Sequence, residues 1–178
     1  GEYSLLQHAL KQINFNASRD RLFSVGDIID RGEASFDCLQ LARENWFIPV
    51  LGNHEQFLRD TLQNDIYKQM AWYQNGGSWW ELLTARQKAE AGTIIERNFS
   101  LTSSVVTAAG RIGIVHAQYP LHRWPISEAE LDSDTLYQLL WSRNCIAETE
   151  NRKVTGIDFI VSGHTPINKP LLKSGQLF

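Results

Sequence analysis

Short apolar runs alternate with amphipathic segments along the first third of the chain. Apolar residues recur at helical spacing over residues 5–13, and a run typical of a buried strand follows at residues 21–25. A second amphipathic segment at residues 36–43 precedes a second apolar run at residues 47–51. A period near 3.6 predicts helices, whereas short apolar runs that end at glycine predict strands. This repeated order of helix and strand indicates an α/β fold.

The second half of the chain repeats the strand pattern. Apolar runs occupy residues 111–115 and 157–161, and the second of these ends at a Ser-Gly pair. Residues 105–107 and the Ala-Ala-Gly turn after them predict that residues 111–115 form the second arm of a hairpin. Between the two halves, residues 56–97 are mostly helical in pattern, and we interpret them as an insertion.

Large aromatic residues gather in this predicted insertion, around a Gly-Gly pair that should interrupt the helix. They are Trp72, Tyr73, Trp79 and Trp80. Either the tryptophans form the core of a helical cap, or they line a substrate groove. Ser78 is placed to cap the helix that follows the glycines.

Composition limits the classes of protein to which the chain could belong. Its 178 residues, 43% of them apolar, suffice for one compact domain, and no linker divides residues 1–178. The 17 basic and 20 acidic residues give a net charge of −3, which argues against a nucleic-acid partner. No apolar run reaches the roughly 18–20 residues of a membrane span, and no secretory signal opens the chain. We therefore expect a cytoplasmic protein with no membrane partner.

Polar side chains follow each of the four predicted strands. Asp27, Asn53 and His164 each come directly after a glycine, and His116 directly follows the run 111–115. Taken singly, a Gly-Asp pair is commonly a turn, and a lone histidine is more often a packing residue. Strands of an open α/β sheet present their carboxyl ends to one crevice, so the four loops should converge. One carboxylate, one amide oxygen and two imidazoles without a thiol suit Mn²⁺, Fe²⁺ or Zn²⁺.

These motifs resemble the signature blocks of a known family. They read Gly-Asp-Ile-Ile-Asp-Arg-Gly at 26–32, Gly-Asn-His-Glu at 52–55, Val-His-Ala at 115–117 and Ser-Gly-His-Thr at 162–165. The chain resembles the PPP-type serine/threonine protein phosphatases of the calcineurin-like metallophosphoesterases, and within them the small bacterial Prp-type and phage lambda-type enzymes. Those enzymes share stretches similar to residues 75–80 and 116–120. The resemblance implies a layered β-sandwich flanked by helices.

The resemblance also implies roles for individual residues. Two divalent metal ions are expected; Mn²⁺ is the first candidate, with Fe²⁺ or Zn²⁺ as alternatives. Asp27 would bridge them, and Asn53, His116 and His164 would complete the ligands of the second ion. His54 would act as the general acid, held in place by Asp30. The phosphate would contact Arg31, Arg143 and Asn53; for Arg143 the alternative is a solvated arginine at a helix end.

The chemistry of a phosphate monoester calls for these groups. Two metal ions supply positive charge and a hydroxide for in-line attack at neutral pH. The planar guanidinium of Arg31 matches two phosphate oxygens at once. A serine or threonine alkoxide leaves poorly unless it is protonated, and His54, kept cationic by Asp30, is the expected proton donor. We therefore expect hydrolysis of phosphoserine and phosphothreonine in phosphoproteins or phosphopeptides.

Two other functions stay open at this stage. One is a dinucleoside-polyphosphate hydrolase of the same superfamily, although the motif around Asp30 and the presence of Glu55 after His54 favour the phosphatase. The other is a catalytically inactive relative that binds phosphate or a partner. The family's first block, Gly-Asp-x-His-Gly, and its last strands lie outside residues 1–178. We therefore expect a chain trimmed at both ends, with little activity of its own.

Overall fold

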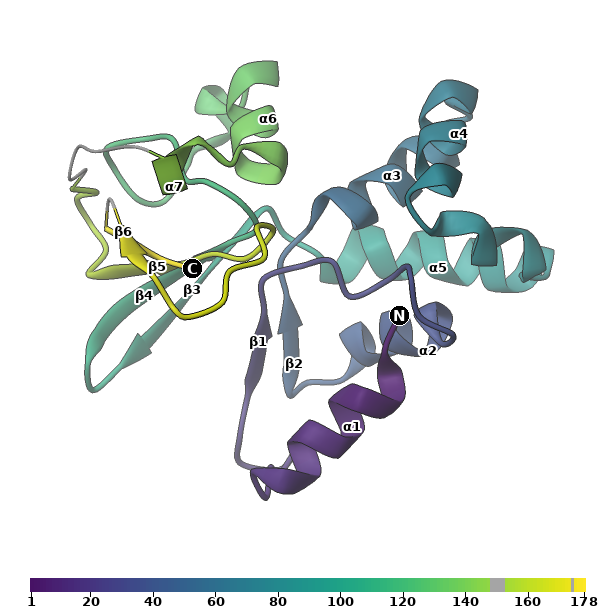
Figure 1. Cartoon of the computed structure of the whole chain (residues 1–178), viewed down its shortest axis with the longest axis horizontal. Helices are drawn as coiled ribbons and strands as arrows, with labels where there is room; N and C mark the ends of the chain where they lie inside the picture. Colours follow the sequence, from purple (N-terminus) through teal and green to yellow (C-terminus); the bar gives the residue numbers. More distant parts are fainter. Residues whose placement is uncertain (148–152, 174) are drawn as a thin grey trace.

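The computed structural model describes residues 1–147, 153–173 and 175–178. The chain folds as a mixed α/β structure with two sheets and helices beside them, which confirms the predicted fold class (Figure 1). Helix α1 (Tyr3–Gln12) leads into strand β1 (Leu22–Ser24). Helices α2 (Ser35–Gln40) and η1 (Leu41–Arg43) then lead into β2 (Phe47–Pro49).

Strands β1 and β2 form a two-stranded parallel sheet in which Leu22 pairs with Phe47 and Ser24 with Pro49. Both strands lie where the apolar runs predicted them, but each regular ladder is only three residues long. Parallel pairing requires a crossover between the strands, and α2 and η1 provide it. The carboxyl ends of both strands therefore point in the same direction.

Residues 53–98 are almost entirely helical. They form α3 (Asn53–Leu62), α4 (Ile66–Gln74), the 3₁₀ helix η2 (Gly77–Leu82) and α5 (Ala85–Asn98). The Gly-Gly pair does end α4, but the prediction for Ser78 is wrong, since it lies inside η2 and its side chain caps nothing there. Thr84 caps α5 instead, through a capping box with Gln87. Within the described residues, no helix combines the length and apolar character that a bilayer span would need.

The second half of the chain forms a five-stranded sheet of order β3-β4-β5-β7-β6. Its strands are β3 (Thr102–Thr107), β4 (Gly110–Val115), β5 (Phe159–Val161), β6 (Leu172–Lys173) and β7 (Gln176–Leu177). The predicted hairpin is confirmed, because β3 and β4 pair antiparallel, and β5 then adds parallel to β4. The sequence pattern assigned no ranges to η3 (Glu128–Glu130), α6 (Ser133–Trp141), α7 (Asn144–Ala147), β6 or β7, although a helix end near Arg143 was one alternative.

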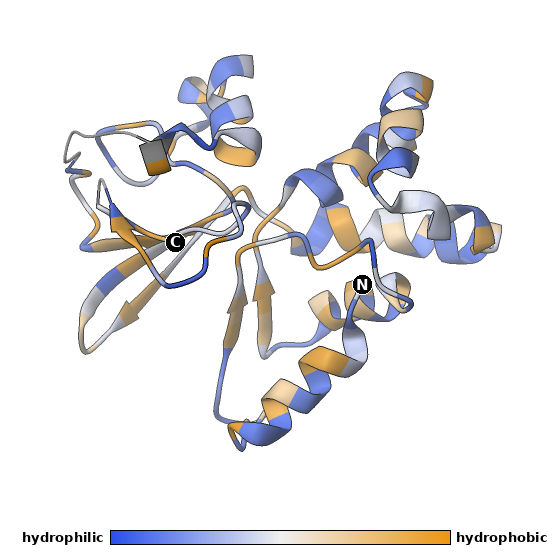
Figure 2. Ribbon diagram, in the orientation of Figure 1, coloured by the Kyte–Doolittle hydropathy of each residue, from blue (hydrophilic) through white to orange (hydrophobic). Residues whose placement is uncertain are grey.

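One apolar core connects the two sheets. Phe47 of the first sheet, Leu58 of α3, and Val115 and Ile160 of the second sheet belong to the same cluster of buried side chains. Figure 2 shows β1 and β2 as mostly hydrophobic, whereas the helices carry hydrophobic and hydrophilic residues in alternation. The common core brings the carboxyl ends of β1, β2, β4 and β5 to the middle of the molecule (Figure 1).

Candidate active site

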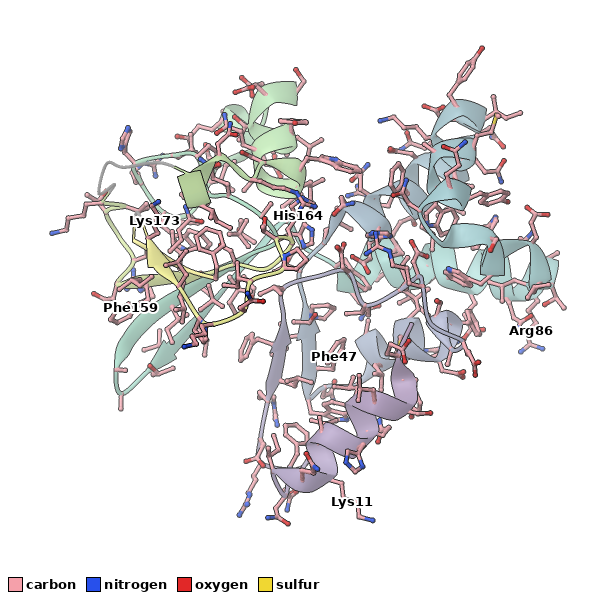
Figure 3. The ribbon with its side chains drawn as sticks, viewed as in Figure 1. Lys11, Phe47, Arg86, Phe159, His164 and Lys173 are labelled. Carbon is pink, nitrogen blue, oxygen red and sulfur yellow. The ribbon has the colours of Figure 1, made fainter. Side chains whose placement is uncertain are left out.

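The four loops that follow these strands converge, as the sequence predicted. His116 Nε2 lies 2.9 Å from Asn53 Oδ1, 3.0 Å from His164 Nδ1 and 3.5 Å from Asp27 Oδ1. One ligand atom each from Asp27, His116 and His164 lies within 4.8 Å of the others. In Figure 3, His164 lies between the five-stranded sheet and the β1–β2 sheet. The four donors thus surround one small volume.

Backbone contacts aim His116 into this group. Its Nδ1 lies 2.6 Å from the carbonyl oxygen of Val25, so Nδ1 carries the hydrogen and Nε2 presents a lone pair to the other donors. Gly26 permits this approach. It has φ of 90°, and a Cβ there would lie 2.9 Å from His116 Nδ1 and 2.7 Å from the nitrogen of Gly52. Any larger residue would push the loops apart.

The lowered pKa values of His116 and His164 suit residues that act as ligands of a metal cation. Burial lowers the pKa of His116, and the opposing charge of Asp27 does not reverse the shift. Burial, the neighbouring His116 and the charge of Arg143 lower the pKa of His164 to about 4. Both imidazoles are therefore neutral near pH 7, the form that binds a metal. With one carboxylate and one amide oxygen beside them, these residues fit a divalent cation.

Glu55 fixes the two loops that carry Asp27 and Asn53. Its Oε2 accepts from the backbone N–H groups of Asp27 at 2.8 Å and Gly52 at 2.9 Å. Its Oε1 accepts from those of Ile28 at 2.8 Å and Ile29 at 3.3 Å. Burial and the charge of Asp27 raise its pKa to about 7, and the backbone donors oppose that rise. The sequence had used Glu55 only to favour one family over another, and its role in holding the loops was missed.

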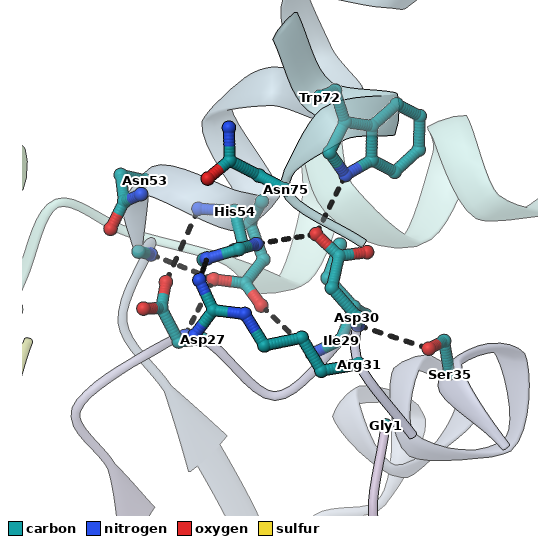
Figure 4. A network of polar contacts seen from close by, with 12 residues as sticks. Gly1, Asp27, Ile29, Asp30, Arg31, Ser35, Asn53, His54, Trp72 and Asn75 are labelled. Atoms are coloured by element: carbon teal, nitrogen blue, oxygen red, sulfur yellow. Dashed lines mark hydrogen bonds and ion pairs between the residues drawn. The ribbon is translucent and has the colours of Figure 1, made fainter. Parts of the chain in front are cut away.

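His54 and Asp30 form the predicted pair. His54 Nδ1 lies 2.5 Å from Asp30 Oδ2, and both side chains are buried (Figure 4). Because a carboxylate only accepts, Nδ1 carries the hydrogen. Burial lowers the pKa of His54, but the hydrogen bond to Asp30 and the charges of Asp27 and Asp30 outweigh it, so the pKa is raised. Arg31 Nη2 lies 3.1 Å from His54 Nε2, which places the first predicted phosphate contact beside the pair.

The aromatic cluster surrounds Asp30 from the other side. Trp72 and Trp80 are buried, which agrees with the core interpretation, while Trp79 is half-buried. Neither alternative anticipated the polar contacts: Trp72 Nε1 donates to Asp30 Oδ2 at 2.7 Å, and Trp79 Nε1 donates to Oδ1 at 2.6 Å. The sequence offered one general indication of these contacts, which is that a buried tryptophan needs an acceptor for its indole N–H.

Arg143 lies after α6, on the side of the site that carries the histidines. Its side chain is exposed, and its charge contributes to the lowered pKa of both His116 and His164. Its positive charge therefore acts on the two histidines of the site. Its assignment as a second phosphate contact stays a prediction.

Backbone strain gathers at the same loops. Asp27, Asp30, Arg31 and His164 all have positive φ, at 56°, 72°, 61° and 62°. Residues other than glycine rarely adopt this region, and each such residue costs on the order of 1 kcal/mol. Such strain persists only where surrounding contacts enforce it, and it is typical of functional sites.

Comparison with known proteins shows the family to which the chain is similar. Residues 1–170 match the calcineurin-like phosphoesterase family. "Serine/threonine-protein phosphatase 1" of Salmonella typhimurium is 35% identical over 173 residues, 95% of this chain and 76% of the relative. "Serine/threonine-protein phosphatase 2" of Escherichia coli is 31% identical over 183 residues, 100% of this chain and 81% of the relative. A symmetrical bis(5'-nucleosyl)-tetraphosphatase of Haemophilus influenzae is 40% identical over only 60 residues, 33% of this chain and 22% of the relative.

Proposed function

Because the chain belongs to the calcineurin-like phosphoesterase family, we propose that it is a metal-dependent phosphoprotein phosphatase acting on phosphoserine and phosphothreonine. The observation that carries the proposal is the convergence of Asp27, Asn53, His116 and His164 next to the His54–Asp30 pair. The serine/threonine phosphatases similar over nearly the whole chain support the choice of substrate class. The cytoplasmic location stays a prediction of the sequence.

The donor set fits the divalent ions that the family uses. Asp27, Asn53, His116 and His164 would hold a cation, and two ions with Asp27 common to both are part of the proposal. Mn²⁺ is the first candidate, followed by Fe²⁺ and Zn²⁺, since mixed oxygen and nitrogen donors without a thiol suit all three. Divalent ions there would neutralise phosphoryl oxygens and lower the pKa of a bound water.

The protein's own residues would bind the phosphate and supply a proton. Arg31, exposed at the edge of the site, offers a fork of N–H groups to two phosphate oxygens. Asn53 and Arg143 would reach the same phosphate. While Arg31 donates to His54 Nε2, that nitrogen acts as an acceptor. A phosphate dianion is a stronger partner for the guanidinium, so its arrival would release Nε2 to carry a proton.

His54 would then protonate the leaving oxygen of serine or threonine. Its raised pKa favours the cationic form, which is the form a general acid requires. Asp30 stabilises the cation through Nδ1 and fixes which way Nε2 points. Without this proton the alkoxide would have to leave as a strong base.

The test is hydrolysis of a phosphoserine peptide by the full-length protein with Mn²⁺. We expect His54→Asn to lower kcat on this substrate by about 10²- to 10⁴-fold, and chelation of the metal to abolish activity. His8→Asn is the matched control, because His8 is exposed and bonds only with Gln12 in the structure. A folded, Mn²⁺-loaded protein that leaves the peptide intact, or a His54→Asn variant as active as His8→Asn, would overturn the proposal.

A dinucleoside-polyphosphate hydrolase is the second candidate, supported by the partial similarity to the tetraphosphatases. That similarity spans 33% to 35% of this chain, so it is compatible with a shared phosphate-cleaving centre and different substrate contacts. Side-by-side assays with diadenosine tetraphosphate and the phosphopeptide distinguish the two. A clear preference for the dinucleotide would replace the first proposal, and cleavage of neither would favour the inactive, phosphate-binding alternative.

A further inference from the structure

The Asp30 carboxylate is enclosed by donors. Its side chain is fully buried, and each of its two oxygens is engaged. Oδ2 accepts from His54 and from Trp72 Nε1 at 2.7 Å, while Oδ1 accepts from Trp79 Nε1 at 2.6 Å. A buried carboxylate is costly unless its oxygens are hydrogen-bonded. The indoles therefore belong to the Asp30–His54 unit as well as to the apolar core.

Two indole N–H groups that bond to different oxygens of Asp30 hold the carboxylate more firmly than one such bond would. The terminal torsion of an aspartate is soft, so a carboxylate held at one oxygen can still turn. Figure 4 shows Trp72 and His54 meeting Asp30 at Oδ2. With the contact of Trp79 on Oδ1, the two indoles together fix the plane of the carboxylate, and with it the direction in which Oδ2 meets His54. The orientation of the imidazole, and so the aim of its Nε2, follows from that plane.

The indoles are themselves held rigidly. The rings of Trp72 and Trp79 pack edge to face, with centroids 5.8 Å apart and planes at 88°, and Trp80 packs against both. The Gly-Gly turn makes this arrangement possible, because a Cβ on Gly77 would overlap the Trp72 ring. Gly76, with φ of 108°, turns the chain so that α4 supplies one indole and η2 the other.

We propose that Trp72 and Trp79 are positioning residues that orient the general acid His54 through paired indole hydrogen bonds to Asp30. The inference rests on the proposed phosphatase function, to which it adds two residues outside the proposed metal ligands and phosphate contacts. An indole N–H donates and cannot accept, so Trp72 and Trp79 act toward the Asp30 carboxylate as donors alone. Phenylalanine would keep an aromatic ring in the cluster and remove the N–H together with part of the ring volume, so a neighbouring Trp→Phe variant is needed as the packing control.

The first test compares Trp79→Phe and Trp72→Phe with Trp80→Phe, a neighbouring buried indole with no hydrogen bond to Asp30 in the structure. Two substrates are used with each Mn²⁺-loaded variant. A phosphoserine peptide releases an alkoxide that needs a proton, whereas p-nitrophenyl phosphate releases a weakly basic phenolate that does not. We expect kcat on the peptide to fall about 10-fold or more in Trp79→Phe, with little change in KM and a much smaller loss on p-nitrophenyl phosphate.

Several outcomes would overturn the proposal. One is an equal loss on both substrates, and another is a loss in Trp80→Phe as large as in Trp79→Phe; either would show a role in packing alone. Should Trp72→Phe fail to fold, the half-buried Trp79 still provides the comparison. If the wild-type protein cleaves p-nitrophenyl phosphate but not the peptide, the substrate class is wrong, and the comparison is repeated with alkyl and aryl monophosphates.

A second measurement does not depend on activity. The chain has six tryptophans, so ¹⁵N-labelled protein gives six indole N–H signals. Asp30→Asn should shift two of these signals strongly, and Trp72→Phe and Trp79→Phe assign them. Invariance of all six signals in folded Asp30→Asn would show that the indoles do not hold the carboxylate in solution.

Discussion

Replacing Glu55 by glutamine tests whether one buried carboxylate holds the site together. The substitution keeps the shape of the side chain and changes one oxygen into an NH₂ group. In the native protein each oxygen accepts two backbone N–H groups, those of Asp27 and Gly52 on Oε2 and those of Ile28 and Ile29 on Oε1. An amide has a single acceptor oxygen, so in either orientation two donors face another donor.

The expected cost follows from these unsatisfied groups. Each buried donor left without an acceptor costs about 1–3 kcal/mol, which gives about 2–6 kcal/mol for two. Burial and the charge of Asp27 already raise the pKa of Glu55 to about 7, so the native carboxylate carries a penalty that glutamine avoids. We therefore expect the lower part of the range, about 2–3 kcal/mol of the free energy of unfolding.

Urea unfolding followed by tryptophan fluorescence measures this loss, and titration calorimetry measures Mn²⁺ affinity. Because Glu55 holds the backbone of Asp27 and Gly52, we expect affinity to fall about 10- to 100-fold. Glu90→Gln is the matched control, since Glu90 pairs with Arg43 at the surface and should cost less than about 1 kcal/mol. A Glu55→Gln variant within about 0.5 kcal/mol of wild type, with unchanged Mn²⁺ affinity, would refute the reasoning.

Three further substitutions test other parts of the site. Asp27→Asn removes the only carboxylate of the described donor set, so calorimetry should show Mn²⁺ affinity reduced by at least about 100-fold, and unchanged affinity would remove Asp27 from the site. Arg31→Gly removes backbone strain at a position with φ of 61°, so thermal melting should show stability within about 1 kcal/mol of wild type. The KM for the phosphopeptide should rise, and an unaltered KM would contradict the phosphate contact. Gly52→Ala places a Cβ against the carboxylate of Asp27 and should lower the free energy of unfolding by about 2 kcal/mol or more. In the control Gly92→Ala, in α5, the added Cβ meets only Leu62, at 3.2 Å, so stability should be unchanged or increased. Equal melting temperatures for the two variants would refute the close approach at Gly52.

The four residues expected to bind metal could be predicted because each follows a short sequence pattern that is recognisable without knowledge of the fold. A strand that ends at glycine is visible within a few residues, and the carboxyl ends of such strands meet by the geometry of the sheet. Asp27, Asn53, His116 and His164 needed no knowledge of side-chain packing, only of which strands exist. The roles of His54 and Arg31 came instead from the resemblance to the phosphatase family, and both residues lie next to these donors, His54 in the first turn of α3 and Arg31 in the loop after β1.

The supporting residues could not be found that way. Glu55 acts on backbone groups up to 28 residues away, and the indoles of Trp72 and Trp79 meet Asp30 across 42 and 49 residues. No periodicity encodes such contacts, since they arise from tertiary packing. Helix α6 is a different case: Asp132 caps it by accepting from the N–H of Thr135, and that signal was present in the sequence. Strands β6 and β7, at two residues each, are too short to show a pattern.

The four residues expected to bind the cation are divided between the two sheets, and this division explains why backbone strain in their loops is tolerated. Asp27 and Asn53 follow the β1–β2 sheet, and His116 and His164 follow strands of the five-stranded sheet, so a cation held by all four would cross-link them. Its binding free energy would stabilise only the folded state. The αL residues on these loops cost on the order of 1 kcal/mol each, an amount that the bonds of Glu55 and the contact of His116 with Val25 can offset. Enforced loop geometry in turn keeps the four donors oriented before the cation arrives, so the strain is a cost of preorganisation rather than a defect of folding.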